Sequence, residues 1–250
     1  MGLKRYNPYE RNCLTMINQQ PLAKVKGVAD LVILVDATGS MRPCIDSIKN
    51  SLMAFIREMT TGGQSPIANW RGRVIGFRDH LTDGDQWIVD NPFVSNDSEA
   101  LLAQVNSVKT KLGGGDGPES LLEALEMILS WRVSEKGRDA NPNEWRATSD
   151  AKRIVLLFTD AGYHESNLVQ SPNTPSQVGA IVTRLNQMKI ELVYVSPDTE
   201  QYDYFESADR SFWTLKLSRP FAKSLKDIAT DNATFGRVMQ AMAKTITREA

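Results

Sequence analysis

The fold is decided by the stretch Leu31-Val32-Ile33-Leu34-Val35 and the turn Asp36-Ala37-Thr38-Gly39-Ser40-Met41 that follows it. The first five residues form a short, continuous apolar run rich in Val and Ile, which predicts a strand buried on both faces. A helical pattern begins after the turn, so the turn joins a strand to a helix. Its carboxylate and hydroxyl oxygens suit Mg²⁺, Mn²⁺ or Ca²⁺ rather than zinc. The stretch therefore predicts a cation site built on Asp36, Thr38 and Ser40.

The same arrangement recurs further along the chain. Apolar strands are predicted at 70–77 and 154–158; the first is followed by Asp79 and His80, and the second by Asp160. Between them lies the densest glycine run, 113–119, which carries Asp116. In an open α/β sheet, ligands bind outside the carboxyl ends of the strands. We therefore expect Asp36, Asp116 and Asp160 to converge at one edge of the sheet.

Strands alternate with helices along the rest of the chain. Such alternation predicts an α/β fold, with a doubly wound, mainly parallel central sheet that has helices on both faces and one antiparallel edge strand. Residues 1–27 are predicted to be an N-terminal arm, and residues 28–250 one domain. The further predicted strands are 87–89, 190–195 and 212–217, and the predicted helices are 45–59, 97–112, 118–129, 177–189, 202–210 and 221–248.

Composition narrows the class of protein. The 250 residues include 29 Lys plus Arg and 30 Asp plus Glu, a formal net charge of -1. This balance argues against direct binding of nucleic acid or of a membrane surface. No apolar run approaches the roughly 20 residues that span a bilayer, and the N-terminus lacks the apolar segment of a secretory signal. Cys13 and Cys44 have no paired metal spacing, so we expect a cytoplasmic protein with reduced thiols.

These residues resemble the von Willebrand factor type A (VWA) domain family. Its metal-ion-dependent adhesion site (MIDAS) combines an Asp-x-Ser-x-Ser turn, a Thr from a later loop and an Asp at a further strand end. Here residues 36–40 match the turn, with Thr38 for the first Ser, and residues 158–161 match the last element. Asp116 stands where the usual Thr would be. The resemblance covers about residues 28–245, and the glycine run and Phe77-Arg78-Asp79-His80 look like a subgroup with Asp-x-Thr-Gly-Ser-Met.

The resemblance implies a VWA/Rossmann-like fold and a MIDAS-like centre that holds Mg²⁺, or Mn²⁺ or Ca²⁺. In the family, an acidic side chain of a partner protein completes the coordination of the ion. Asp116 would add a third carboxylate, either as a direct ligand or as an acceptor for a metal-bound water. The implied metal ligands are Asp36, Thr38, Ser40, Asp116 and Asp160, and the implied rim or second-shell residues are Asp79, His80, Gly39, Gly115 and His164.

The function that the resemblance implies is a non-enzymatic, protein-binding adaptor. Its partner is a protein that contributes an acidic side chain to the ion. Stand-alone intracellular members of the family look like components of multi-protein systems, beside kinases, phosphatases or AAA+ ATPases. This implies a bacterial stress-response or phage-defence setting.

Two other interpretations stay open. The turn is also similar to the Asp-Lys-Thr-Gly-Thr phosphorylation turn of the haloacid dehalogenase superfamily, where a strand-end Asp is the nucleophile and Mg²⁺ assists phosphoryl transfer. Against it, Ala37 stands beside Asp36, and the residues before Gly113 are polar and helical. The third interpretation is a metal-free structural VWA domain, in which Asp36 and Asp160 only cap turns.

Overall fold

Within the described part of the chain, the central sheet has seven strands. The computed structural model describes residues 27–61, 67, 69–111, 117–165 and 177–247, so Asp116, Gly115 and the predicted arm, apart from Gly27, lie outside the described residues. The strands are β1 (Val28–Asp36), β2 (Asn69–Phe77), β3 (Ile88–Asp90), β4 (Val94–Ser95), β5 (Lys152–Phe158), β6 (Ile190–Pro197) and β7 (Ser211–Leu217). Their order is β3-β2-β1-β5-β6-β7, and β4 also pairs with β2.

The pairing of the strands confirms the predicted fold class. β1 lies between β2 and β5 and is parallel to both, and β5–β6 and β6–β7 are parallel as well. β3 and β4 both run antiparallel to β2. The antiparallel edge therefore consists of two short strands, of which the two-residue β4 was not predicted because a dipeptide gives no alternation to detect.

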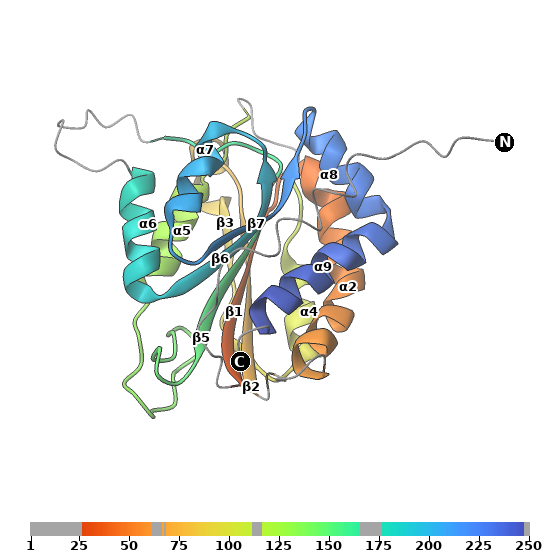
Figure 1. Ribbon diagram of the computed structural model, residues 1–250. Coiled ribbons are helices and arrows are strands. Elements are labelled where there is room, and N and C mark those ends of the chain that lie inside the picture. Colours follow the sequence, from red (N-terminus) through yellow and green to blue (C-terminus); the bar gives the residue numbers. More distant parts are fainter. Residues whose placement is uncertain (1–26, 62–66, 68, 112–116, 166–176, 248–250) are drawn as a thin grey trace.

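Helices cover both faces of the sheet (Figure 1). β1 is buried on both faces: Leu31, Ile33 and Val35 contribute to one apolar cluster, and Val32 and Leu34 to the other. One face carries α2 (Arg42–Thr61), α4 (Ser98–Ser107), α8 (Phe221–Thr230) and α9 (Asn232–Thr247). The other carries α5 (Leu121–Ser130), α6 (Gln177–Met188) and α7 (Glu200–Asp203).

Several predicted helix ends were wrong. The helix predicted to reach Leu112 ends at Ser107, because Val108 adopts extended backbone angles. The helix predicted from Pro118 begins at Leu121, since the chain before it bonds to neighbouring loops. The helix predicted over 221–248 is two helices that part at Asp231, whose carboxylate accepts from Ala233 N at 3.1 Å. The helix predicted over 202–210 is α7 followed by a 3₁₀ turn, Tyr204–Ser207.

Glycine lets β2 approach α4 closely. A Cβ at Gly76 would lie 2.7 Å from Val108 Cγ1, and one at Gly72 would lie 2.7 Å from Leu101 Cδ2. Real Cβ contacts are longer than this, so a side chain at either position would push the helix away. The two glycines thus set the distance between the sheet and α4.

The amino ends of the strands hold a buried charge cluster. Asp30 is fully buried and accepts from Arg71 Nη2 at 2.7 Å and from Arg146 Nε at 2.6 Å. Trp145, next to Arg146, is also fully buried and packs against Phe93 with ring centroids 5.4 Å apart. The polar connection 134–151 is therefore anchored to the sheet at this end.

Cys44 lies in the first turn of α2 and is fully buried. Within the described part of the chain, no helix is long and apolar enough to cross a membrane.

Candidate metal centre

Two carboxylates meet at the carboxyl ends of neighbouring strands. Asp36 is the last residue of β1, and Asp160 lies two residues beyond the end of β5, the strand that pairs with β1. Ser40 Oγ donates to Asp160 Oδ1 at 3.0 Å and lies 3.2 Å from Thr38 Oγ1. Thr38 Oγ1 in turn donates to Asp36 Oδ1 at 2.7 Å. The structure thus brings together four of the five predicted ligands in one hydrogen-bonded group.

Thr159 belongs to this group although its role was not predicted. Its Oγ1 donates to Asp36 Oδ2 at 2.9 Å and accepts from Ala161 N at 3.1 Å. Asp36 Oδ1 also accepts from Thr38 N at 2.9 Å. Both oxygens of Asp36 are therefore fixed by donors. Thr159 stands beside Asp160 in the sequence motif, but only the pairing of β1 with β5 shows that its hydroxyl reaches Asp36.

The electrostatics of the group favour a cation. Asp36 is fully buried, and burial raises the pKa of its carboxyl from 3.8 to about 7; the charge of Asp160 adds to the increase, and hydrogen bonds from Thr38 and Thr159 oppose it. Burial also raises the pKa of Asp160. Two desolvated carboxylates at one place disfavour each other's ionisation. A bound cation would remove that penalty.

One oxygen in the group is left over. Asp160 Oδ2 is buried and has no hydrogen-bond partner among the described residues. A buried carboxylate oxygen without a partner is costly and calls for an explanation. The oxygen lies in a set of two carboxylates and two hydroxyls, which are the hard donors that Mg²⁺, Mn²⁺ and Ca²⁺ prefer. The residues present therefore fit the predicted kind of ion.

Among the described residues, the centre offers two carboxylates and two hydroxyl groups. Across the residues that the structure describes, no group of three or more His, Cys, Asp or Glu side chains is placed to hold a metal. Zinc sites are usually built from such ligands. Mg²⁺ instead retains several waters and needs only one or two carboxylates. The described donor set thus favours a partly hydrated, weakly held ion.

The turn itself is short. Gly39 begins a 3₁₀ turn, Gly39–Met41, that places Ser40 Oγ within hydrogen-bond distance of Asp160. On its other side, Lys111 N donates to Ala37 O at 3.2 Å. The chain therefore passes beside the turn immediately before the glycine run that carries Asp116. Ligation by Asp116, and a rim position for Gly115, stay predictions.

Three predicted rim residues gather in a second group. Asp79 is buried, accepts from Thr82 Oγ1 at 2.6 Å and lies 3.3 Å from His164 Nε2. His80 Nδ1 lies 2.6 Å from Ser120 Oγ, at the start of α5. Burial opposes ionisation of Asp79, but donors from Thr82 and Leu81 and the two histidines lower its pKa overall.

This second group ties three loops together. It joins the segment after β2, which holds Asp79 and His80, to the segment after β5, which holds His164. Glu119 adds backbone bonds, donating from N to Gly162 O at 2.9 Å and accepting from His164 N at 3.1 Å. The segment that bears Asp160 is therefore held from two sides.

Comparison with known proteins finds matches among solved structures. No family model matches the chain, and no curated protein matches it. Three solved structures of proximal thread matrix protein 1 from the mussel byssus are similar, with TM-scores of 0.48, 0.46 and 0.47 and 14% sequence identity. One of them is described as having a zinc-occupied MIDAS motif. Each match covers 87% of this chain, which spans only 47% or 48% of the mussel chain.

Proposed function

We propose that this chain is a VWA-type binding module of the Asp-x-Thr-Gly-Ser-Met subgroup. Its centre binds a divalent cation, Mg²⁺ or else Mn²⁺ or Ca²⁺, and the cation binds an acidic side chain of a partner protein. The observation that carries this proposal is Asp160 Oδ2, a buried and unpaired carboxylate oxygen beside a second buried carboxylate, Asp36. A cation at this place satisfies the unpaired oxygen and the surplus of negative charge together.

Each residue of the centre has a separate task. Thr38 and Thr159 hold the carboxylate of Asp36 in one orientation. Thr38 and Ser40 present neutral hydroxyl oxygens, and Asp160 presents the unpaired carboxylate oxygen. When bound, the ion supplies positive charge and an open coordination position for an outside oxygen. Two carboxylates and two hydroxyls leave coordination positions of such an ion open, and an external carboxylate can fill one of them.

The proposed role is that of an adaptor rather than an enzyme. Asp36 is fully buried, and protein donors occupy both of its oxygens. A nucleophilic aspartate needs one oxygen that faces the substrate, so this geometry disfavours phosphoryl transfer of the haloacid dehalogenase type. The proposed partners are a kinase, a phosphatase or an AAA+ ATPase within a bacterial stress or defence system.

The proposal is tested first by binding of the ion. Calorimetric titration with Mg²⁺ should show binding to the wild type and a loss of at least about tenfold in affinity for Asp160→Asn, which keeps the shape and removes the charge. Glu135→Gln, on the exposed connection far along the chain, removes a carboxylate elsewhere and should bind like the wild type. Equal binding by all three proteins would favour the metal-free interpretation.

The partner is tested next. Affinity capture with the wild type and with Asp36→Ala, each with and without EDTA, should recover a partner only with the wild type and only without EDTA. Recovery of the same proteins in all four samples would contradict adhesion through the ion.

A further inference from the structure

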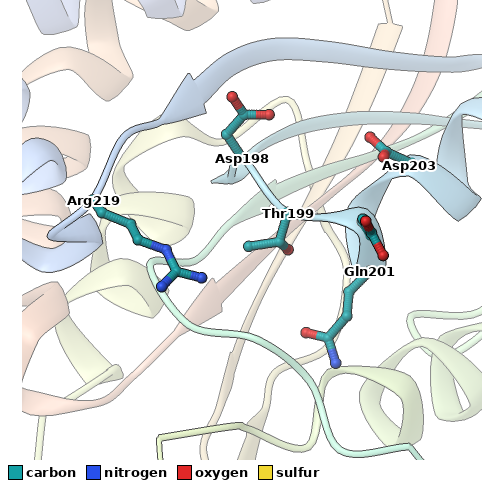
Figure 2. Close-up of a pocket in the computed structure, with 6 residues that line it drawn as sticks. Asp198, Thr199, Gln201, Asp203 and Arg219 are labelled. Atoms are coloured by element: carbon teal, nitrogen blue, oxygen red, sulfur yellow. The ribbon is translucent and has the colours of Figure 1, made fainter.

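The short helix α7 places a buried tyrosine beside the candidate centre. Tyr202 is fully buried, whereas Glu200 and Asp203, at the two ends of the helix, are exposed. The Tyr202 hydroxyl donates to Ala161 O at 2.6 Å, and Ala161 directly follows Asp160. Figure 2 shows polar side chains of the same segment, which line a pocket at the surface: Asp198, Thr199, Gln201 and Asp203. Tyr202 therefore links a surface segment to the backbone of the centre.

Aromatic packing fixes the position of the Tyr202 hydroxyl. The centroid of its ring lies 5.6 Å from that of Tyr163, 6.1 Å from that of Phe205 and 6.3 Å from that of Trp213. The helix is also tied to the loop after β5, because Gln201 Nε2 donates to Tyr163 O at 3.1 Å and Tyr163 Oη donates to Gln201 O at 2.6 Å. A ring packed on several sides keeps one orientation, so the hydroxyl stays at Ala161.

Thr159 is a second donor within reach of the same carbonyl. Its Oγ1 lies 3.5 Å from Ala161 O but only 2.9 Å from Asp36 Oδ2. A threonine hydroxyl has one proton, so the two oxygens compete for it. The shorter bond from Tyr202 satisfies Ala161 O, and the Thr159 proton is then left for Asp36.

The Tyr202 hydroxyl keeps its own proton. Burial raises the pKa of Tyr202 well above its ordinary value of 10.0, and the charge of Asp36 adds to the increase, whereas a hydrogen bond with Thr159 opposes it. A phenol in such surroundings is neutral around pH 7 and remains a donor. It can therefore hold Ala161 O under the conditions in which the centre would bind its ion.

We propose that Tyr202 is a positioning residue of the ion centre: by donating to Ala161 O, it directs the Thr159 proton to Asp36 and so fixes the Asp36 carboxylate for the cation. The inference rests on the proposed function and adds a residue that sets the affinity for the ion without being a ligand. Without the Tyr202 hydroxyl, Thr159 turns its proton to Ala161 O. Asp36 is then held through Oδ1 alone, by Thr38.

The proposal is tested with Tyr202→Phe, which removes the hydroxyl and keeps the ring. Calorimetric titration should show Mg²⁺ binding roughly three- to tenfold weaker than in the wild type. Loss of a group that orients a metal ligand costs about 10- to 100-fold, and Tyr202 acts one hydrogen bond further away. The matched control is Tyr194→Phe on β6, which removes the hydroxyl of another fully buried tyrosine, 3.5 Å from Tyr202 O. It should bind Mg²⁺ like the wild type.

A double-mutant cycle separates positioning from a general loss of stability. In Thr159→Val there is no hydroxyl proton to direct, so the further change Tyr202→Phe should leave the Mg²⁺ affinity unchanged. The losses of unfolding free energy, measured with urea in EDTA, should instead add, because each variant removes a different donor. A purely structural role of Tyr202 would lower the affinity by the same factor in both backgrounds.

Three results would overturn the assignment: wild-type Mg²⁺ affinity in Tyr202→Phe, an equal loss in Tyr194→Phe, or the same loss from Tyr202→Phe with and without the Thr159 hydroxyl. The wild type separates this failure from that of the proposed function. If the wild type binds Mg²⁺ and Tyr202→Phe binds it equally well, the positioning role alone is refuted. If the wild type binds no divalent cation, the proposed function fails, and the role of Tyr202 fails with it.

Discussion

At the scale of single residues, the centre is held in a state that suits a cation better than a proton. Asp36 has its oxygens fixed by Thr38 and Thr159 but lies fully buried. Asp160 has one satisfied and one unsatisfied oxygen. Without an ion, protonation is the remaining way to lower the energy of two buried carboxylates. The affinity for the ion and the protonation of Asp36 are therefore linked.

The first prediction is a change in stability with pH. Burial raises the pKa of Asp36 in the folded protein to about 7, above its ordinary value of 3.8. The folded state then binds the proton more tightly than the unfolded state, so the stabilisation is complete below 3.8 and is lost as pH rises to about 7. In EDTA, the contribution of Asp36 to the free energy of unfolding, measured with urea, should therefore decrease over this pH range. The decrease should be smaller in Asp36→Asn.

Mg²⁺ should reverse this trend, because it binds the ionised carboxylates. The increase in unfolding free energy caused by Mg²⁺ should be larger at about pH 8 than at about pH 5. The same increase at both pH values would mean that Mg²⁺ binds elsewhere.

The second prediction concerns Thr159. Thr159→Val keeps the shape of the side chain but removes the donor to Asp36 Oδ2 and the acceptor for Ala161 N. We expect the unfolding free energy to fall by about 1–3 kcal/mol, as for loss of a buried hydrogen bond, and the Mg²⁺ affinity to fall with it. Thr159→Ser retains the hydroxyl and should keep most of both. Chemical denaturation and calorimetry measure the two effects.

At the scale of secondary-structure elements, the sequence predicted the bodies of the strands and helices better than their ends. β1 and β5 are continuous apolar runs, and the polar residues that follow them mark where each strand stops. The end of α4 is different: Val108 packs against Gly76, and Lys111 pairs with Ala37. Such contacts between distant segments leave no periodic pattern, so the helix was predicted too long.

The third prediction tests that contact between elements. Gly76→Ala places a methyl group 2.7 Å from Val108 Cγ1, and overpacking of this kind costs about 1–3 kcal/mol of unfolding free energy. Val108→Ala removes the opposing methyl groups, so the double variant should be more stable than the sum of the two single losses implies. A double-mutant cycle by urea denaturation measures the coupling. Simple additivity would contradict the contact.

In the candidate centre, too, residues that follow a local sequence pattern could be predicted, and contacts between distant segments could not. Asp36, Thr38, Ser40 and Asp160 could be predicted because each follows a recognisable strand and the carboxyl ends of parallel strands share one edge. The pairings of Asp79 with His164 and of His80 with Ser120 could not. Both depend on how loops of irregular backbone lie against each other, which residue order alone does not determine.

At the scale of the whole molecule, the two ends of the sheet hold different groups of residues. The carboxyl end gathers the residues of the candidate centre. The amino end gathers Asp30 with Arg71 and Arg146, a buried cluster that fastens the 134–151 connection to β1 and β2. Within the described residues, the hydrogen bonds of the Asp30 carboxylate run to Arg71 and Arg146 and not to the centre. We therefore expect stability and ion binding to be separable by mutation.

The fourth prediction uses that separation. Asp30→Asn leaves the buried Arg71 and the partly buried Arg146 without their carboxylate, and breaking a buried pair in this way costs about 3–5 kcal/mol. We expect a large loss of unfolding free energy by urea denaturation. The Mg²⁺ affinity of the folded fraction should nevertheless stay at the wild-type value by calorimetry. A parallel loss of affinity would show that the two ends of the sheet are coupled.

The reactivity of the buried Cys44 thiol can report on opening of the centre. It lies in the first turn of α2, just beyond the Asp36–Ser40 turn, and burial, then the charges of Asp160 and Asp36, raise its pKa far above the usual range. An alkylating reagent attacks only the thiolate of an accessible cysteine. The alkylation rate of Cys44 therefore reports how often this turn separates from the sheet. A cation bound at the centre should lower that rate.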